Sequence, residues 1–167
     1  MITEKIEKIL NDQIAKEGYS SNLYLSMASY AETSGYEGTA NWLYAQAEEE
    51  KMHMLKFVHY VNARGGKAKI SAMDEPPFEF GSIRDLFEKV FEHEQFISSS
   101  INNIVGACMD ERDFTTHNWI QWFVTEQIEE EATVSGIIDK LNLLDGKSLY
   151  HFDRDLMESR SAGGEPL

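Results

Sequence analysis

Hydrophobic side chains recur every three to four residues along four long stretches of the chain, with polar residues between them. This spacing is typical of amphipathic helices, which turn about 100° per residue and so gather such positions on one face. The four apolar faces include Ile6, Leu10, Ile14, Tyr24 and Ala28; Leu43, Ala47, Phe57 and Val61; Ile83, Phe87, Val90, Ile97 and Ile101; and Trp119, Phe123, Val134, Ile137 and Leu141. Four long helices with one buried face each predict an all-α fold, a four-helix bundle.

Start and stop signals set the expected limits of the helices. The four run from about Thr3 to Thr33, Glu37 to Arg64, Ser82 to Glu111, and Thr115 or Thr116 to just before Gly146. A short fifth helix is expected at about residues 148–158, followed by a loose tail over residues 159–167. The chain, 1–167, is then expected to be a single domain, with the bundle at about residues 3–144.

The links between the helices predict the topology. The first and third links are short, so each joins an antiparallel pair of helices. The second link, Gly65 to Gly81, has about 17 residues, which can reach roughly 56 Å when extended. A helix of about 28 residues is only about 42 Å long. The link can therefore return along the whole bundle, as one long crossover that starts the third helix parallel to the second.

Each apolar face carries a glutamate near the middle of its helix. These are Glu17, Glu50, Glu94 and Glu130, and His53 follows one turn after Glu50. A carboxylate among apolar side chains costs several kcal/mol unless it is compensated. The midpoints of aligned helices share one level, so the four carboxylates are expected to converge, and a bound metal pair is the simplest compensation. Carboxylates with one imidazole suit iron and manganese.

Composition narrows the range of partners. The chain has 15 basic and 29 acidic residues and a net charge of −14, which argues against nucleic acid and anionic membranes. Cys108 is the only cysteine, so no intrachain disulfide is expected and a cytoplasmic location is predicted. No apolar run reaches transmembrane length, and the start of the chain lacks a signal-peptide pattern.

These motifs together resemble the bacterial non-haem ferritins, over nearly the whole chain. The resemblance is carried by the lone Glu17 and Glu94, the Glu50-x-x-His53 pair and a run in the fourth helix, Phe123-Val124-Thr125-Glu126-Gln127-Ile128-Glu129-Glu130-Glu131. Gln127 stands where bacterioferritins and other di-iron proteins begin a second Glu-x-x-His pair. In this respect the chain is similar to ferritins proper.

The resemblance implies a di-iron centre and its ligands. Glu17, Glu50 and His53 would hold the first iron. Glu50 would bridge to a second iron, held by Glu94 and Glu130. Gln127 would lie adjacent to the second iron.

The resemblance also implies a third iron site and a redox-active side chain. The third site would be formed by Glu49, Glu126 and Glu129, although Glu49 and Glu129 could also be plain solvated residues. Tyr24 would lie beside the centre in a catalytic role, or would be a core tyrosine whose hydroxyl bonds Glu17. No haem is expected, because Lys51 occupies the place of the haem methionine of bacterioferritins.

The function implied by the resemblance is iron storage with ferroxidase activity. Fe(II) would be oxidised by O2 or H2O2, and ferric mineral would be stored in a homo-oligomeric cage of 24 subunits. Leu23 and Tyr30, which lie off the inward face of the first helix, are candidates for contact with another subunit. The alternative is a rubrerythrin-type di-iron peroxidase without storage, although a Cys-x-x-Cys module and a second Glu-x-x-His are missing. A third class is a shell-forming subunit without catalysis, and the intact ligand set argues against it.

Overall fold

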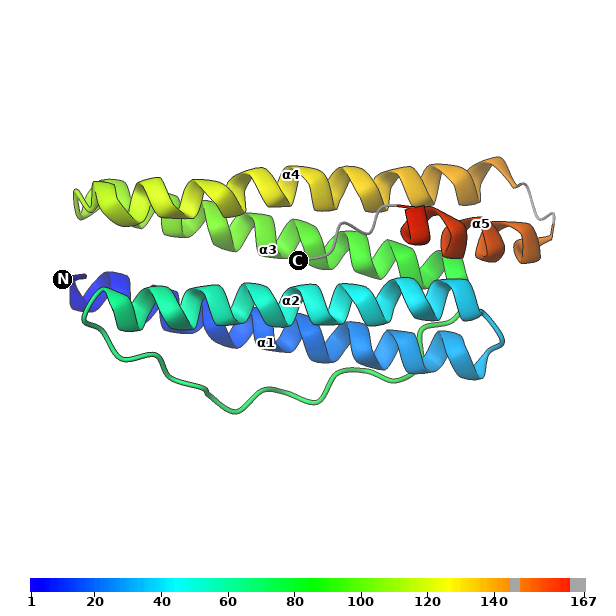
Figure 1. The fold of residues 1–167 in the computed structure, drawn as a ribbon, viewed down its shortest axis with the longest axis horizontal. Helices are drawn as coiled ribbons and strands as arrows, with labels where there is room; N and C mark the ends of the chain where they lie inside the picture. Colours follow the sequence, from blue (N-terminus) through cyan, green and yellow to red (C-terminus); the bar gives the residue numbers. More distant parts are fainter. Residues whose placement is uncertain (145–147, 163–167) are drawn as a thin grey trace.

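The chain folds into two helical hairpins that lie side by side, with a fifth helix at one end (Figure 1). The computed structural model describes residues 1–144 and 148–162. The helices are α1 (Glu4–Thr33), α2 (Glu37–Ala63), α3 (Ile83–Asp110), α4 (Phe114–Leu143) and α5 (Leu149–Ala162). The predicted all-α bundle is confirmed, and the described residues contain no strand. No helix among them is long and apolar enough to cross a membrane.

The long link between α2 and α3 runs back along the bundle and makes α3 parallel to α2, as predicted (Figure 1). It is fastened to α1 at several points. Asn11 donates a hydrogen bond to the Lys67 carbonyl at 3.1 Å, and Ser26 donates to the Pro77 carbonyl at 2.6 Å. Near the end of the link, Tyr30 donates to the Gly81 carbonyl at 2.7 Å. The crossover therefore covers part of the surface of α1.

This covering weakens the expectation that Leu23 and Tyr30 contact another subunit. The Tyr30 ring packs against Phe80 of the crossover, with the ring centroids 5.6 Å apart. Leu23 is 6% exposed and belongs to a core cluster of its own chain. The helical wheel places these side chains off the inward face, but it cannot include a return segment that lies over that side. Leu23 is therefore no argument for assembly, whereas contact of the half-buried Tyr30 with another subunit stays a prediction.

Two of the predicted caps are confirmed. The Thr3 hydroxyl accepts a hydrogen bond from the Ile6 amide at 3.3 Å. Ser82 forms a capping box with Asp85, in which each side chain accepts from the other residue's backbone amide. Such caps satisfy amides that have no partner inside the helix.

The predicted start of α4 at Thr115 or Thr116 is wrong by one or two residues. The helix begins at Phe114, and its N-cap is Asp113, which accepts from the Thr116 amide at 3.0 Å. Asp is as good an N-cap as Thr or better. Its carboxylate also accepts from the Thr116 hydroxyl, so that threonine lies within the first turn. The expected stop at Gly146 lies outside the described residues.

The fifth helix is longer than expected and ends at Ala162 rather than near Glu158. No glycine or proline stands between Leu149 and Gly163, so nothing ends the helix at the predicted place. Residues 159–162 of the expected loose tail are thus helical, and residues 163–167 lie outside the described part.

A side chain of α5 caps the start of α2. Tyr36, at the N-cap position of α2, makes no side-chain capping bond. Instead the Asp153 carboxylate accepts from the Gly38 and Thr39 amides, each at 2.8 Å, and from the Thr39 hydroxyl at 2.8 Å. A Cβ on Gly38 would lie only 1.9 Å from the Asp153 carbonyl oxygen, so this close approach needs glycine. The negative charge also suits the positive end of the helix dipole.

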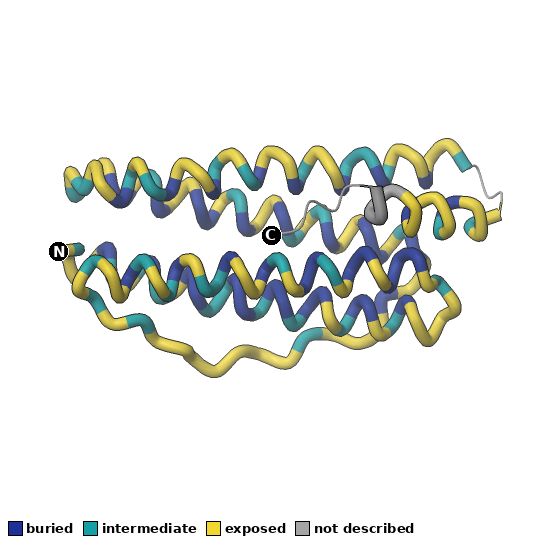
Figure 2. The backbone as a smooth tube through the Cα atoms, viewed as in Figure 1, coloured by how far each residue is buried: buried dark blue, intermediate teal, exposed yellow. Residues whose placement is uncertain are grey.

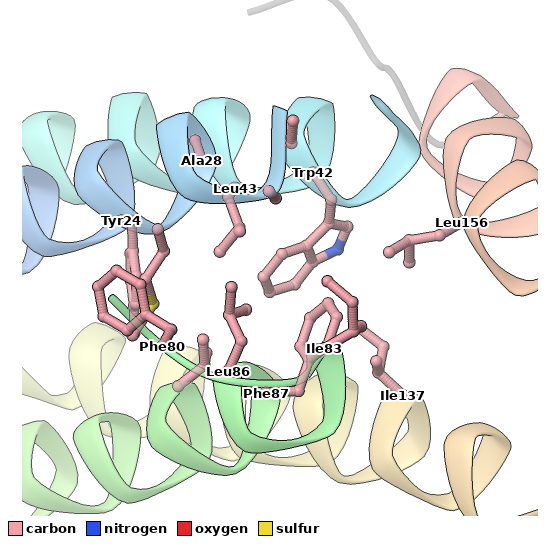
Figure 3. Close-up of a cluster of buried hydrophobic side chains, with 14 of the residues drawn as sticks. Tyr24, Ala28, Trp42, Leu43, Phe80, Ile83, Leu86, Phe87, Ile137 and Leu156 are labelled. Atoms are coloured by element: carbon pink, nitrogen blue, oxygen red, sulfur yellow. The ribbon is translucent and has the colours of Figure 1, made fainter. Parts of the chain in front are cut away.

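The buried apolar side chains form two clusters, one toward each end of the bundle, and dark blue segments mark the buried backbone in Figure 2. The α5-side cluster includes Leu43, Phe87, Ile137 and Leu156, and Figure 3 shows Leu156 of α5 pointing toward Trp42 of α2. The opposite cluster includes Ile6, Leu10, Phe57, Ile101 and Phe123. Apart from Gly18, the buried residues between the two clusters along the helices are polar.

Candidate metal centre

A layer of buried polar side chains crosses the bundle between the two apolar clusters. We call it the mid-bundle polar layer, and its members are Gln13, Glu17, Gln46, Glu50, His53, Glu94, Gln127 and Glu130. Each of the four long helices supplies one glutamate. Glu17, Glu50 and Glu94 are each 1% exposed and Glu130 is 7% exposed. These positions repeat the spacing of the apolar stripes, which is why regular helices bring the carboxyl groups to one level.

Glu17, Glu50 and His53 come closest to a ready ligand set. One ligand atom from each lies within 4.8 Å of the other two. His53 Nδ1 is 3.4 Å from Glu50 Oε2, one helical turn apart. Among the described residues, Glu17 Oε2 and Glu50 Oε2 are buried oxygens without a hydrogen-bond partner. Unpaired buried acceptors are costly, and a cation between them would supply the missing interaction.

The electrostatics of the layer show the same deficit of positive charge. Burial, and then the charge of Glu50, raises the pKa of Glu17 well above its ordinary value. Burial, and then Glu94, raises the pKa of Glu50 in the same way. Burial, followed by Glu94 and Glu49, raises the pKa of Glu130 to about 8. Without a cation the layer therefore favours protonated carboxyls, and a bound cation would reverse this preference.

Glu94 and Glu130 are held by hydrogen-bond donors from other helices. Gln127 Nε2 donates to Glu94 Oε2 at 3.0 Å and to the Glu94 carbonyl at 3.2 Å. Gln46 Nε2 donates to Glu130 Oε2 at 2.6 Å. Within the described part of the chain, neither glutamate joins a group of three potential ligands inside 4.8 Å. The structure thus assembles the proposed first-iron set more closely than the second.

Tyr24 lies in the site, but its partner is not the expected one. Its hydroxyl donates to Glu94 Oε1 rather than to Glu17. The sequence placed Tyr24 and Glu17 on one face of the same helix, and the packing of α1 against α3 brings Glu94 within reach. Burial, and then Glu94, raises the pKa of Tyr24 well above its usual range, so the phenol keeps its proton.

The structure brings together only two of the three residues expected at the third site. Glu49 and Glu126 each have an oxygen within 4.8 Å of one another and of a His53 nitrogen. Glu129 is exposed and is not part of this group. Burial raises the pKa of Glu126, while nearby His53 lowers it. His53 thus belongs to both groups of potential metal ligands.

Sequence reasoning missed Gln13, which is fully buried and donates from Nε2 to Glu17 Oε1 at 2.7 Å. The available signal was a glutamine four residues before Glu17, which is one turn away on the same face of the helix. It also left His93 without a role. The structure puts His93 Nε2 2.7 Å from the Ser20 hydroxyl, and burial lowers its pKa to about 4.

Comparison with known proteins agrees with this geometry. Residues 7–144 match the ferritin-like domain family. The chain is 46% identical over 158 residues to a probable bacterial non-heme ferritin-like protein of Haemophilus influenzae, with 93% of this chain and 96% of that protein covered. It is 41% identical over 156 residues to a bacterial non-heme ferritin of Campylobacter jejuni, with 92% and 93% covered. An open pore ferritin of Archaeoglobus fulgidus has a TM-score of 0.92 at 44% identity, with 93% and 96% covered. The resemblance inferred from the glutamate and glutamine motifs is thereby confirmed, and the chain belongs to the ferritin-like family.

Proposed function

We propose that this protein stores iron and oxidises Fe(II) at the mid-bundle polar layer, where two irons bind as substrate. The observation that carries the proposal is the buried group Glu17, Glu50 and His53, with two carboxylate oxygens that accept no hydrogen bond from the described residues. The relatives named as ferritins support the same conclusion. Glu50 would bridge the irons, and Glu94 and Glu130 would hold the second.

The side chains favour oxidation by their donor type. Carboxylates are hard ligands and suit Fe(III) better than Fe(II). Two Fe(II) ions supply the two electrons that reduce one O2 to H2O2, or one H2O2 to water. Fe(II) binding displaces protons from Glu17 and Glu50, because burial raises the pKa of both carboxyls. With one imidazole and carboxylate bridges, the ferric product stays labile enough to move on.

Storage requires an enclosed space, and we propose a cage of 24 copies in the cytoplasm. The net charge of −14 would concentrate cations inside such a shell. We propose that haem is not bound. Lys51 follows Glu50, and Met52 is 45% exposed.

The test is anaerobic addition of Fe(II) to chelator-treated protein, followed by air. Ferric absorbance and particle size are read from the same sample. We expect fast oxidation by a particle far larger than the 19.1 kDa chain. Glu50→Ala and His53→Ala should slow oxidation by more than the roughly 10- to 100-fold that follows loss of an outer partner. The exposed His59→Ala serves as the matched control.

Two results would contradict the proposal. Wild-type oxidation rates in both ligand variants would remove the di-iron assignment. A monomer or dimer at physiological salt, with or without iron, would favour the rubrerythrin-type peroxidase that stores nothing.

We further propose a third iron site at Glu49 and Glu126, with Glu129 at its edge. Glu126→Ala should then change the number of irons bound per subunit more than Glu129→Ala, because Glu126, unlike Glu129, belongs to the group of potential ligands around His53. Fe(II)-soaked crystals with only two metals per subunit would rule out the third site.

A further inference from the structure

A chain of hydrogen bonds leads from a half-buried lysine to the carboxylate of Glu17. Lys16 Nζ donates to Ser100 Oγ at 2.6 Å. Ser100 Oγ donates to Gln13 Oε1 at 2.6 Å, and Gln13 Nε2 donates to Glu17 Oε1 at 2.7 Å. Gln13 is fully buried and Ser100 is 5% exposed. The chain connects α1 to α3 and approaches Glu17 from the side of its Oε1 atom.

When Glu17 is ionised, as it is when it holds a cation, the direction of every bond in this chain is fixed by chemistry. A lysine ammonium only donates, and an ionised carboxylate only accepts. Ser100 has a single O–H, and because Lys16 occupies an acceptor position of its oxygen, the proton goes to Gln13. The amide of Gln13 then has one orientation, with its oxygen toward Ser100 and its nitrogen toward Glu17.

The two carboxylate oxygens of Glu17 therefore have different surroundings. Oε1 is held by Gln13, whereas Oε2 has no hydrogen-bond partner among the described residues. Glu17 also belongs to the close group with Glu50 and His53. Tying one oxygen restricts rotation of the carboxyl group and leaves the other oxygen for a cation.

We propose that Gln13, Ser100 and Lys16 are positioning residues. They hold the Glu17 carboxylate by Oε1, so that Oε2 is oriented to bind a metal ion. This inference rests on the proposed function, because it assigns these residues to the same iron site. The competing explanation is that they merely satisfy each other's buried polar groups. Outer partners of metal ligands typically change metal affinity about 10- to 100-fold, so the two explanations differ in a measurable quantity.

The experiment titrates chelator-treated protein with Co(II), which air does not oxidise, and follows its visible absorption bands and the heat of binding. A Glu17→Ala variant identifies the part of the signal that depends on Glu17. Gln13→Met keeps the volume and removes the donor, and we expect it to weaken the Glu17-dependent affinity about 10- to 100-fold. Ser100→Ala should have a smaller effect, and Lys16→Met the smallest.

Matched controls separate positioning from folding. Ser99→Ala and Lys8→Met change exposed neighbours of the same type, and both should bind Co(II) like the wild type. Ser100→Thr keeps the hydroxyl and should restore the affinity and the band shape that Ser100→Ala loses. Thermal midpoints of the metal-free variants are measured beside the titrations, since a purely structural role would move only these.

Each outcome decides something. If Gln13→Met and Ser100→Ala bind Co(II) with wild-type affinity and spectrum, the positioning role is overturned while the iron site stands. Lys16→Met, whose side chain is half-buried, keeps the test valid if a core variant does not fold. A wild-type protein without any Glu17-dependent Co(II) band overturns the proposed function, and this inference with it.

Discussion

The mid-bundle polar layer and the two apolar clusters occupy the same helix faces, yet they have opposite effects on the stability of the metal-free protein. In the clusters, side chains such as Leu43 and Phe57 are fully buried and contribute favourable burial, about 1.5–3 kcal/mol each. In the layer, Glu50 is just as buried and raises the free energy of the metal-free fold. The difference shows that the clusters stabilise the bundle, while the layer trades stability for binding.

Neutral hydrogen-bond donors offset only part of the free-energy cost of burying the carboxylates of the layer. Gln13, Gln46 and Gln127 each donate to a different site carboxylate. Among the described residues, no Lys or Arg forms an ion pair with Glu17, Glu50, Glu94 or Glu130. An amide orients a carboxylate without neutralising it, so the site keeps its affinity for cations. A lysine in place of one of these glutamines would neutralise a carboxylate of the layer and abolish that affinity for cations.

The largest effect on stability should come from the apolar clusters. Phe57 is fully buried, and its ring centroid is 4.4 Å from that of Phe123 and 5.1 Å from that of Trp119. Phe57→Ala should lower the free energy of unfolding by about 3–5 kcal/mol, because it removes buried area and leaves a cavity. Urea titration of the metal-free protein measures it. Phe78→Ala, at a position 72% exposed, should change it by far less.

A substitution in the polar layer should have the opposite sign. Glu50→Leu fills a similar volume without a charge and should raise the free energy of unfolding of the metal-free protein by about 1–4 kcal/mol. Added Fe(II) or Co(II) should stabilise the wild type and not the variant, because ligand binding to the folded state adds stability. Glu48→Leu is the control, since Glu48 is exposed on the same helix. If Glu50→Leu lowers the stability of the metal-free protein as much as Phe57→Ala does, then the layer stabilises the fold as the clusters do, and the contrast between them is wrong.

The layer should also make the metal-free protein less stable as pH rises. Burial raises the pKa of Glu130 from its ordinary value of 4.5 to about 8, so the folded state holds a proton that the unfolded state releases. The stability gained from this proton is complete below about pH 4.5 and is lost as pH rises toward 8. Between pH 5 and 7 we expect a loss on the order of 2–3 kcal/mol.

Glu130→Gln should flatten this part of the pH profile. The comparison with wild type at each pH cancels titrating groups that do not interact with Glu130, such as His93. Thermal or urea unfolding in a chelator provides the measurement. Parallel profiles for the two proteins would mean that Glu130 titrates at an ordinary pKa.

The smallest effect is expected where α5 meets the α5-side cluster. Asp153→Ala removes three hydrogen bonds to the start of α2 and should cost about 0.5–2 kcal/mol, the usual value of a helix cap. Amide exchange should increase first at Gly38 and Thr39. Asp155→Ala, on the exposed side of α5, should leave both the thermal midpoint and the exchange unchanged. Equal exchange in both variants would mean that apolar packing alone holds α5.

The four helices, the crossover, the shared level of the four glutamates and the family could all be predicted from the order of residues alone. These features depend on periodicity, which is local: a glutamate in the register of an apolar stripe must face the core wherever the helix packs. The caps at Thr3 and Ser82 were readable for the same reason, because each bonds within its own first turn.

Which individual atoms contact one another could not be predicted in this way, because it depends on how the helices pack. Tyr24 bonds Glu94, 70 residues away in sequence, and Ser100 orients Gln13 across 87 residues. Asp153 caps a helix that begins more than a hundred residues earlier, at a separation of 115 from Gly38. Periodicity gives the face of a helix but not the rotation, height and neighbours that bring one side-chain oxygen within hydrogen-bond distance of another. Those are fixed by the packing of all five helices and the crossover together.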